Sequence, residues 1–117
     1  MSLKRGSIIL VPFPFTDLSN YKIRPALVIS NSEEEEDIIV AFITSVIYDL
    51  LKLTDYKINK SDLFFNETGL KTDSIVKCNK LATISKNIIL GRIGDIRESI
   101  MIKEVDTRLK IVLSIFP

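Results

Sequence analysis

The stretch SIILVPF at residues 7–13 is an apolar run of Ile, Leu, Val and Phe that follows Ser7. A short apolar run rich in β-branched residues indicates a buried strand. Pro12 lies within the run and Pro14 directly follows it, and proline has no backbone N–H to donate to a sheet. We therefore predict a strand that ends at this point or runs along the edge of a sheet.

Four further stretches share this apolar, β-branched character: RPALVIS at 24–30, IIVAFITS at 38–45, SIVKC at 74–78, and IILGRIG at 88–94, which Gly91 interrupts. We predict a strand at each of them. A weak strand is also expected near 54–58, in a less clear part of the sequence. Polar loops are expected at 16–22 and 31–37, a turn ending at Gly69, and a helical turn within 79–87.

The C-terminal segment changes to a helical period. Apolar residues recur there at spacings of four, four, three and four, which place them on one helix face: Met101, Val105, Leu109, Val112 and Phe116. Asp95 is the predicted N-cap, with Glu98 completing a capping box. Short strands followed by one helix predict a mainly β fold, a small barrel or curved sheet with the C-terminal helix packed on it.

Length and composition limit the function classes. The chain has 117 residues, 46% of them apolar and 26% charged, which fits one globular domain over residues 1–117. It has no histidine, and Cys78 is its one cysteine. These facts exclude Cys/His zinc sites, Ser-His-Asp and Cys-His catalysis, and an intramolecular disulfide. We see no leader and no apolar run long enough to cross a bilayer, so we expect a cytoplasmic protein with no membrane association.

The charges are unevenly distributed, although the net charge is only +1. The run 33–37 holds five of the 15 acidic residues, whereas residues 71–97 hold six Lys and Arg against two acids. A basic face kept apart from one acidic loop is compatible with a polyanionic partner. The alternative is a solvated surface of mixed charge.

Four blocks of the sequence together resemble the MazF/PemK (Kid) family of toxin endoribonucleases. They are RGSIILVPFPFTDLS at 5–19, RPALVIS at 24–30, AFITS at 41–45 and GLKTDSIVKCNKLATI at 69–84. The resemblance implies an SH3-like barrel, a homodimer, and the toxin role in a toxin–antitoxin system. It also implies sequence-selective cleavage of single-stranded RNA through 2′-OH attack, inhibition by a cognate antitoxin, and no metal or other cofactor.

Without histidine, such chemistry must use Arg, Lys, carboxylate, hydroxyl or backbone groups. Arg24 opens a predicted strand, and a guanidinium grips two phosphate oxygens at any working pH. The resemblance makes Arg24 and Thr44 catalytic, with the Thr44 hydroxyl beside the scissile phosphate. The alternatives are a surface arginine at a strand end and a threonine that serves strand packing.

The chain departs from the resemblance at two places: the block at 77–79, and Ser7, which stands where many relatives have Asp after Arg-Gly. Kid-like members carry Arg-Cys-Asp, with the Arg and Asp proposed as acid and base, where this sequence reads Lys77-Cys78-Asn79. Lys77 keeps the charge without the planar two-point grip, and Asn79 cannot act as a base. Either Arg24 and Thr44 carry the chemistry or the activity is weak. We interpret Cys78 as a small buried core residue and Ser7 as structural.

The remaining candidates are RNA contacts. Lysines are candidates for phosphate binding, aromatic side chains for stacking on unpaired bases, and two small polar residues for contacts beside the reacting groups. The set comprises Lys22, Lys77, Lys80, Phe15, Tyr21, Ser45 and Asn79. Two other functions stay open: a non-catalytic barrel module that binds RNA or an antitoxin, and a gyrase poison of the CcdB type.

Overall fold

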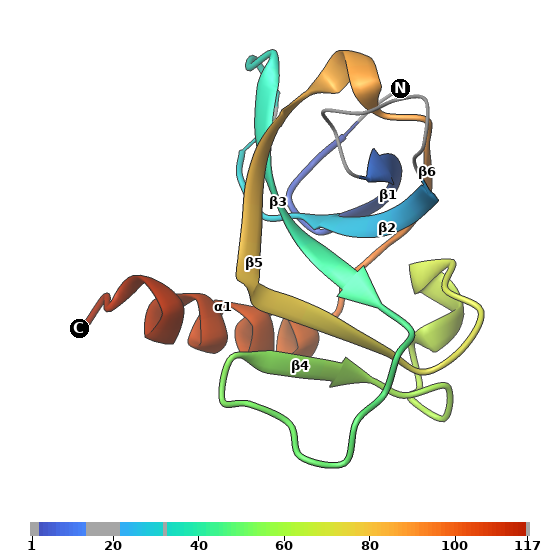
Figure 1. Ribbon diagram of the computed structural model, residues 1–117, viewed down its shortest axis with the longest axis vertical. Coiled ribbons are helices and arrows are strands. Elements are labelled where there is room, and N and C mark those ends of the chain that lie inside the picture. Colours follow the sequence, from blue (N-terminus) through green and yellow to red (C-terminus); the bar gives the residue numbers. More distant parts are fainter. Residues whose placement is uncertain (1–2, 14–21, 32, 117) are drawn as a thin grey trace.

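The computed structural model describes residues 3–13, 22–31 and 33–116 (Figure 1). In chain order the elements are β1 (Ser7–Phe13), β2 (Lys22–Val28), β3 (Asp37–Thr44), β4 (Asp55–Ile58), the 3-10 helix η1 (Phe65–Thr68), β5 (Ser74–Ser85), the 3-10 helix η2 (Lys86–Ile88), β6 (Gly91–Asp95) and α1 (Ser99–Leu113). The six strands form one antiparallel sheet in the order β4-β5-β3-β2-β1-β6. The mainly β prediction with one C-terminal helix is confirmed.

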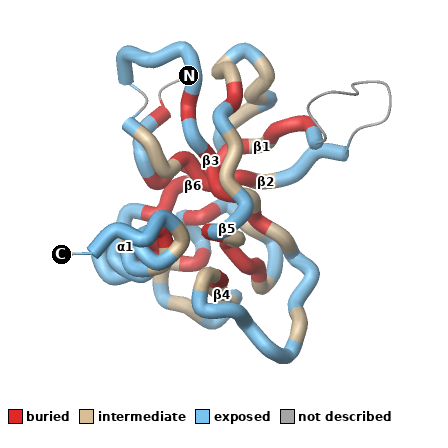
Figure 2. Tube along the Cα trace, turned by 60° about the vertical axis from the view of Figure 1, so that its left-hand side comes forward, coloured by how far each residue is buried: buried red, intermediate tan, exposed pale blue. Residues whose placement is uncertain are grey.

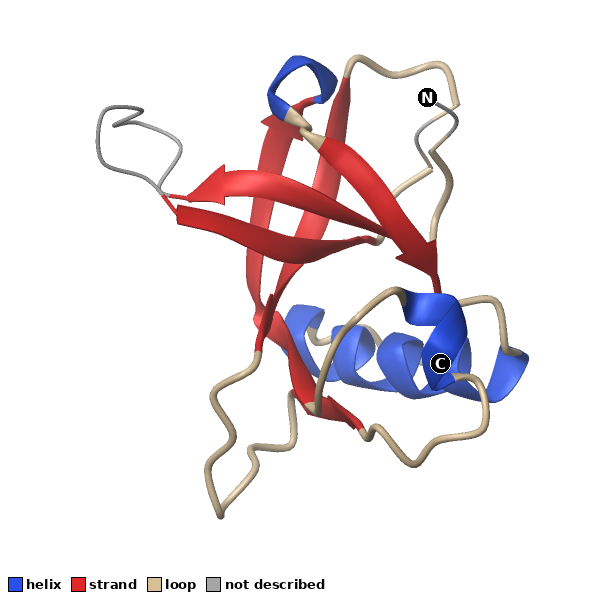
Figure 3. Cartoon of the chain, turned by 90° about the vertical axis from the view of Figure 1, so that its right-hand side faces the viewer, coloured by secondary structure: helices blue, strands red, loops and turns tan. Residues whose placement is uncertain are grey.

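The sheet curls strongly and α1 packs against it (Figures 1 and 3). β1, β2 and the first part of β3 wrap around one core, while α1 lies against β4 and the first part of β5. The buried stretches lie mainly along the strands and the inner side of the helix, and most of the described loop residues are exposed (Figure 2). No helix within the described residues is long and apolar enough to span a membrane.

The strands are apolar on both faces because the sheet has a core on each side. In β3, Ile38 and Val40 pack in the core inside the curl, whereas Ala41 and Ile43 pack in the core that α1 covers. β1 divides in the same way between Ile9 and its neighbour Ile8. Burial on both faces explains why these strands appear in the sequence as continuous apolar runs rather than as alternating patterns.

The helix begins later than its predicted N-cap. Glu98 is the N-cap residue, and its carboxylate accepts a hydrogen bond from the Ile100 N–H at 3.1 Å. The prediction that Asp95 caps α1 is wrong, since Asp95 ends β6 and is buried. Its carboxylate instead accepts a hydrogen bond from the Ser7 hydroxyl at 3.1 Å and one from Arg97 at 3.1 Å. This contact gives Ser7 a structural role.

The predicted buried face of the helix is confirmed in its first three members, Met101, Val105 and Leu109. Val112 is only partly buried, packed at the edge of the core beneath α1. Phe116 lies beyond the end of α1 and is 82% exposed, so its predicted place on the buried face is wrong. The helix ends at Leu113, before the apolar period reaches this residue.

β5 is longer than predicted. The helical turn expected within 79–87 is wrong over 79–85, where the strand continues and pairs with β3 from Asp37 to Ala41. The turn falls instead at η2, residues 86–88, and β6 starts at Gly91 rather than being interrupted there. Pairing with β3 satisfies the backbone groups of this segment, which therefore adopts the strand.

Candidate nucleic-acid cleft

The strand register places three predicted site residues on one face of the sheet. Ala26 of β2 lies opposite Phe42 of β3, which lies opposite Lys77 of β5. Residues directly opposite in antiparallel strands share a face, as do residues two apart along a strand. Arg24 is two residues from Ala26, and Thr44 is two residues from Phe42. Arg24, Thr44 and Lys77 therefore project from three neighbouring strands toward the same side.

These three side chains line one cleft of about 690 Å³. Its lining combines three cations, a hydroxyl, an amide and a phenol with apolar and aromatic side chains. The lining residues are Phe13, Arg24, Phe42, Ile43, Thr44, Val46, Tyr48, Lys77, Asn79, Lys80, Leu81 and Ala82. Within the described residues the lining contains no carboxylate. A concave site with this lining favours an anionic ligand.

Arg24 and Thr44 meet the geometric requirement for a shared ligand, since neither is sealed in the interior. Arg24 is exposed, and within the described part of the chain it forms no ion pair. Thr44 is partly buried, and its hydroxyl oxygen accepts a hydrogen bond from the Val46 N–H at 3.1 Å. A hydroxyl that accepts one bond still has its hydrogen to donate. The Val46 contact therefore orients a donor at the end of β3.

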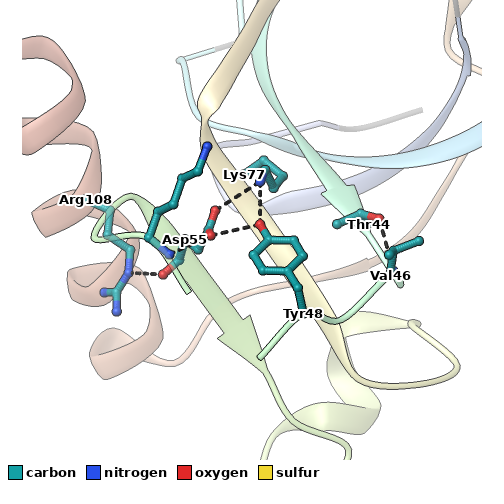
Figure 4. A network of polar contacts seen from close by, with 7 residues as sticks. Thr44, Val46, Tyr48, Asp55, Lys77 and Arg108 are labelled. Atoms are coloured by element: carbon teal, nitrogen blue, oxygen red, sulfur yellow. Dashed lines mark hydrogen bonds and ion pairs between the residues drawn. The ribbon is translucent and has the colours of Figure 1, made fainter. Parts of the chain in front are cut away.

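Lys77 is held by a network that joins the cleft to the protein interior (Figure 4). Its ammonium donates a hydrogen bond to the Tyr48 hydroxyl and lies 3.4 Å from Asp55 Oδ1. The Tyr48 hydroxyl donates to Asp55 Oδ2 at 2.8 Å, and the Lys52 N–H donates to the same oxygen at 2.9 Å. The Asp55 side chain is fully buried, so the carboxylate depends on these partners.

The network sets the charge states of its members. Burial works to raise the pKa of Asp55, but the Lys52 N–H, the Tyr48 hydroxyl and the Lys77 charge outweigh it and lower that pKa below its ordinary value. The hydrogen bond to Tyr48 raises the pKa of Lys77; burial opposes this effect, and the Asp55 charge adds to it. At neutral pH the network is therefore a carboxylate paired with an ammonium.

β5 bends sharply beside this network. Its pairing with β3 shifts register between Leu81 and Lys77, which leaves Cys78, Asn79 and Lys80 as a bulge. Asn79 and Lys80 are exposed and line the cleft, whereas Cys78 turns into the core. Burial raises the pKa of the Cys78 thiol to about 11, as suits a core residue.

Two predicted RNA contacts, Lys22 and Ser45, do not join this group. Lys22 is exposed on β2 opposite Phe13, and Ser45 is exposed just beyond β3; neither lines the cleft. Phe15 and Tyr21 lie outside the residues that the structure describes, as does most of the loop expected at 16–22.

The two residues that hold Lys77, Tyr48 and Asp55, were not predicted from the sequence, and neither were most of the apolar and aromatic residues that line the cleft. Tyr48 stands four positions after Thr44 in a segment without periodicity, and Asp55 begins a weak strand. The signal that links them to Lys77 is the β4–β5 pairing, in which Asp55 lies opposite Lys77. A charged pair across two strands becomes visible only when the register is known.

The fold and the cleft define a class: a small protein with one curled antiparallel sheet that gathers cationic and hydroxyl groups in one cleft. The model of the PemK-like, MazF-like toxin family of type II toxin-antitoxin systems matches residues 4–113, and the chain belongs to this family. No curated protein matches the chain in sequence.

Solved structures share the fold at low sequence identity. An endoribonuclease from a mycobacterial species, in complex with its cognate antitoxin, has a TM-score of 0.75 and 17% identity, with 99% of this chain and 100% of that chain covered. The toxin MazF-mt6 of Mycobacterium tuberculosis has a TM-score of 0.70 and 18% identity, over 95% and 99%. MazF in a MazE–MazF structure from Deinococcus radiodurans has a TM-score of 0.73 and 14% identity, over 99% of both chains.

Proposed function

We propose that this protein is the toxin of a toxin–antitoxin system and acts as a metal-independent, sequence-selective endoribonuclease on single-stranded mRNA. One domain over residues 1–117 carries this activity in the cytoplasm, where mRNA is found. The observation that supports the proposal best is the common cleft of Arg24 and Thr44 in a chain of the PemK-like, MazF-like family.

In the proposed reaction the RNA supplies its own nucleophile. The 2′-oxygen loses its proton and bonds to the adjacent phosphorus, the bond from phosphorus to the 5′-oxygen breaks, and the leaving oxygen takes up a proton. The products are a 2′,3′-cyclic phosphate and a 5′-hydroxyl. Arg24 binds two phosphate oxygens, and the Thr44 hydroxyl donates to a non-bridging phosphate oxygen, where negative charge develops in the transition state.

The cleft also contains groups that suit an unpaired RNA strand. Lys77 and Lys80 neutralise backbone phosphates, and Asn79 offers an amide to a base edge. Phe13 and Phe42 form an edge-to-face pair with ring centroids 5.0 Å apart at the cleft wall. Such a pair supplies an aromatic surface for base stacking.

The decisive experiment incubates the purified protein with a long unstructured RNA in EDTA and sequences the fragment ends. We expect discrete fragments with cyclic phosphate ends, and a loss of cleavage of at least about 100-fold in Arg24→Ala, because one transition-state donor contributes on that scale. Lys71→Ala, an exposed basic residue outside the cleft, is the control.

Two results would contradict this proposal. Cleavage that persists in Arg24→Ala would exclude the assigned chemistry. Intact RNA together with trapped gyrase–DNA complexes would instead identify a gyrase poison of the CcdB type.

The proposal extends to a homodimer and to an antitoxin that blocks the cleft. The segment between β3 and β4 exposes apolar side chains, including Leu50 at 87% and Leu53 at 82%, and Val46 continues this surface into the cleft. An antitoxin segment that is apolar and acidic would suit both parts. Light scattering at micromolar concentration tests the dimer, and a monomer would contradict it.

A further inference from the structure

Asp55 is an unusual residue to find behind a cleft that binds an anion. Its side chain is fully buried, and its carboxylate is repelled by any phosphate in the cleft. A buried charge is stabilising only when it is paired and hydrogen-bonded. Here the partners come from the cleft side, through Tyr48 and Lys77, and from the backbone of Lys52.

The contacts of Lys77 leave one of its donors for a ligand. An ammonium has three N–H groups in a tetrahedral arrangement. One donates to the Tyr48 hydroxyl, and the ammonium nitrogen also forms an ion pair with Asp55, 3.4 Å from Oδ1. Lys77 lines the cleft with its side chain 13% exposed, so the third N–H has access to the cleft.

We propose that Tyr48 and Asp55 are positioning residues for RNA binding, which hold the Lys77 ammonium so that its third N–H binds a backbone phosphate. This inference rests on the proposed function, because RNA is the ligand. A lysine on a flexible stem normally supplies charge without direction. Contacts with Tyr48 and Asp55 fix the orientation of the Lys77 ammonium. An arginine would not need such contacts, because its planar guanidinium already has a fixed donor geometry.

Tyr48 acts through Lys77 in this arrangement. Its hydroxyl donates a hydrogen bond to the Asp55 carboxylate and accepts one from the Lys77 ammonium. The Lys77 ammonium also lies 4.9 Å from the centre of the Tyr48 ring, which adds a cation–π contact. Removing the hydroxyl therefore loosens the ammonium while the ring and the charge remain.

A double-mutant cycle tests this dependence. The variants are Tyr48→Phe, Lys77→Met and the double variant, and the probe is a labelled random-sequence pool of 2′-O-methyl RNA, which cannot be cleaved through its 2′ position. The dissociation constant is measured by fluorescence anisotropy at several salt concentrations. Tyr56→Phe and Lys103→Met are the matched controls, since neither residue lines the cleft.

We expect Lys77→Met to weaken binding about tenfold and to lower the salt slope by about 0.7, the value of one phosphate contact on a single strand. Tyr48→Phe is expected to weaken binding several-fold on its own and to have no further effect in the Lys77→Met background. If Lys77 only stabilised the fold, Lys77→Met would leave the dependence of the dissociation constant on salt concentration unchanged. An effect of Tyr48→Phe that persists at full size without Lys77 would overturn the proposal.

The experiment separates this inference from the proposed function. If the wild type binds the uncleavable pool but leaves ordinary RNA intact, the nuclease function fails while the cycle still reports on Tyr48. If the wild type does not bind the pool, the positioning role is overturned. Lys77→Met removes one member of a buried charge pair, as Asp55→Asn would, so circular dichroism verifies that Lys77→Met and the double variant are folded before binding is measured.

Discussion

At the scale of single residues, the geometry of the cleft depends on the buried carboxylate of Asp55, which does not itself line the cleft. Asp55 sits in the interior, and its carboxylate balances the charge of Lys77 across two paired strands. Removing one member of a buried pair costs more than the pair contributes, because the other charge is left uncompensated. The same residue therefore supports both the stability of the fold and the geometry of the cleft.

The lowered pKa of Asp55 predicts acid sensitivity. A carboxyl group whose folded pKa lies below its ordinary value of 3.8 adds stability above that pH and loses it as the pH falls through the folded pKa. We expect Asp55→Asn to lower the free energy of unfolding by about 3 kcal/mol at pH 7. The difference from wild type should shrink below pH about 4. Urea unfolding from pH 3 to 7 measures it.

Asp49→Asn is the control for this prediction, because Asp49 is an exposed acid on the same segment. Lys77 gives the mirror image: its raised pKa adds stability below its ordinary value of 10.5, and this stability is lost as the pH rises through the folded value. A difference between wild type and Asp55→Asn that stays constant down to pH 3 would contradict the assignment.

At the scale of elements, the sequence predicts the apolar strands well because both of their faces are buried. β1 and β4 fall where their stretches predict, and the buried side of α1 follows the helical period. The second half of β5 was not predictable in this way. Leu81 to Ser85 form a strand because β3 offers them a partner, and such long-range pairing overrides local preference.

The site follows the same division. Arg24 and Thr44 are predicted from the sequence because each belongs to a short block that resembles a known family. Tyr48 and Asp55 are missed because their link to Lys77 exists only through the β4–β5 register and the bend of β5. The prediction of the helix N-cap is wrong for a similar reason, because Asp95 is held in the sheet by Ser7 and Arg97.

Gly69 provides a prediction at this scale. It ends η1 with φ of 73°, in the left-handed region, and a Cβ there would lie 2.0 Å from the Ile93 carbonyl oxygen of β6. We expect Gly69→Ala to lower the free energy of unfolding by at least about 1–3 kcal/mol, because the backbone strain and the clash with β6 both oppose the native state. Urea denaturation measures this loss.

Gly91→Ala is the matched control for Gly69→Ala. A Cβ at Gly91 would meet nothing within 4 Å, and its backbone is in a strand. We expect a change within about 0.5 kcal/mol, which is usual for a surface substitution away from special contacts. Equal effects of the two variants would show that contact with β6 does not determine the role of Gly69.

At the scale of the whole molecule, the topology separates the two charged regions. The acidic run 33–37 leads into the start of β3, whereas Thr44 of the cleft ends the same strand. An eight-residue strand puts these ends on the order of 20 Å apart. The small net charge of +1 therefore conceals a cationic cleft and a distant acidic loop.

This separation predicts that the acidic run does not tune the cleft. Changing Glu33, Glu34, Glu35 and Glu36 to Gln together raises the net charge by four, yet the run lies more than two Debye lengths, each about 8 Å at physiological salt, from Thr44. We expect RNA affinity and cleavage rate at that salt to stay within about twofold of wild type. Lys80→Ala, a single charge inside the cleft, should weaken binding more than the four changes alter it. A tenfold gain in RNA affinity from the glutamine variant would show that the acidic loop acts on the cleft, which the topology places out of its electrostatic reach.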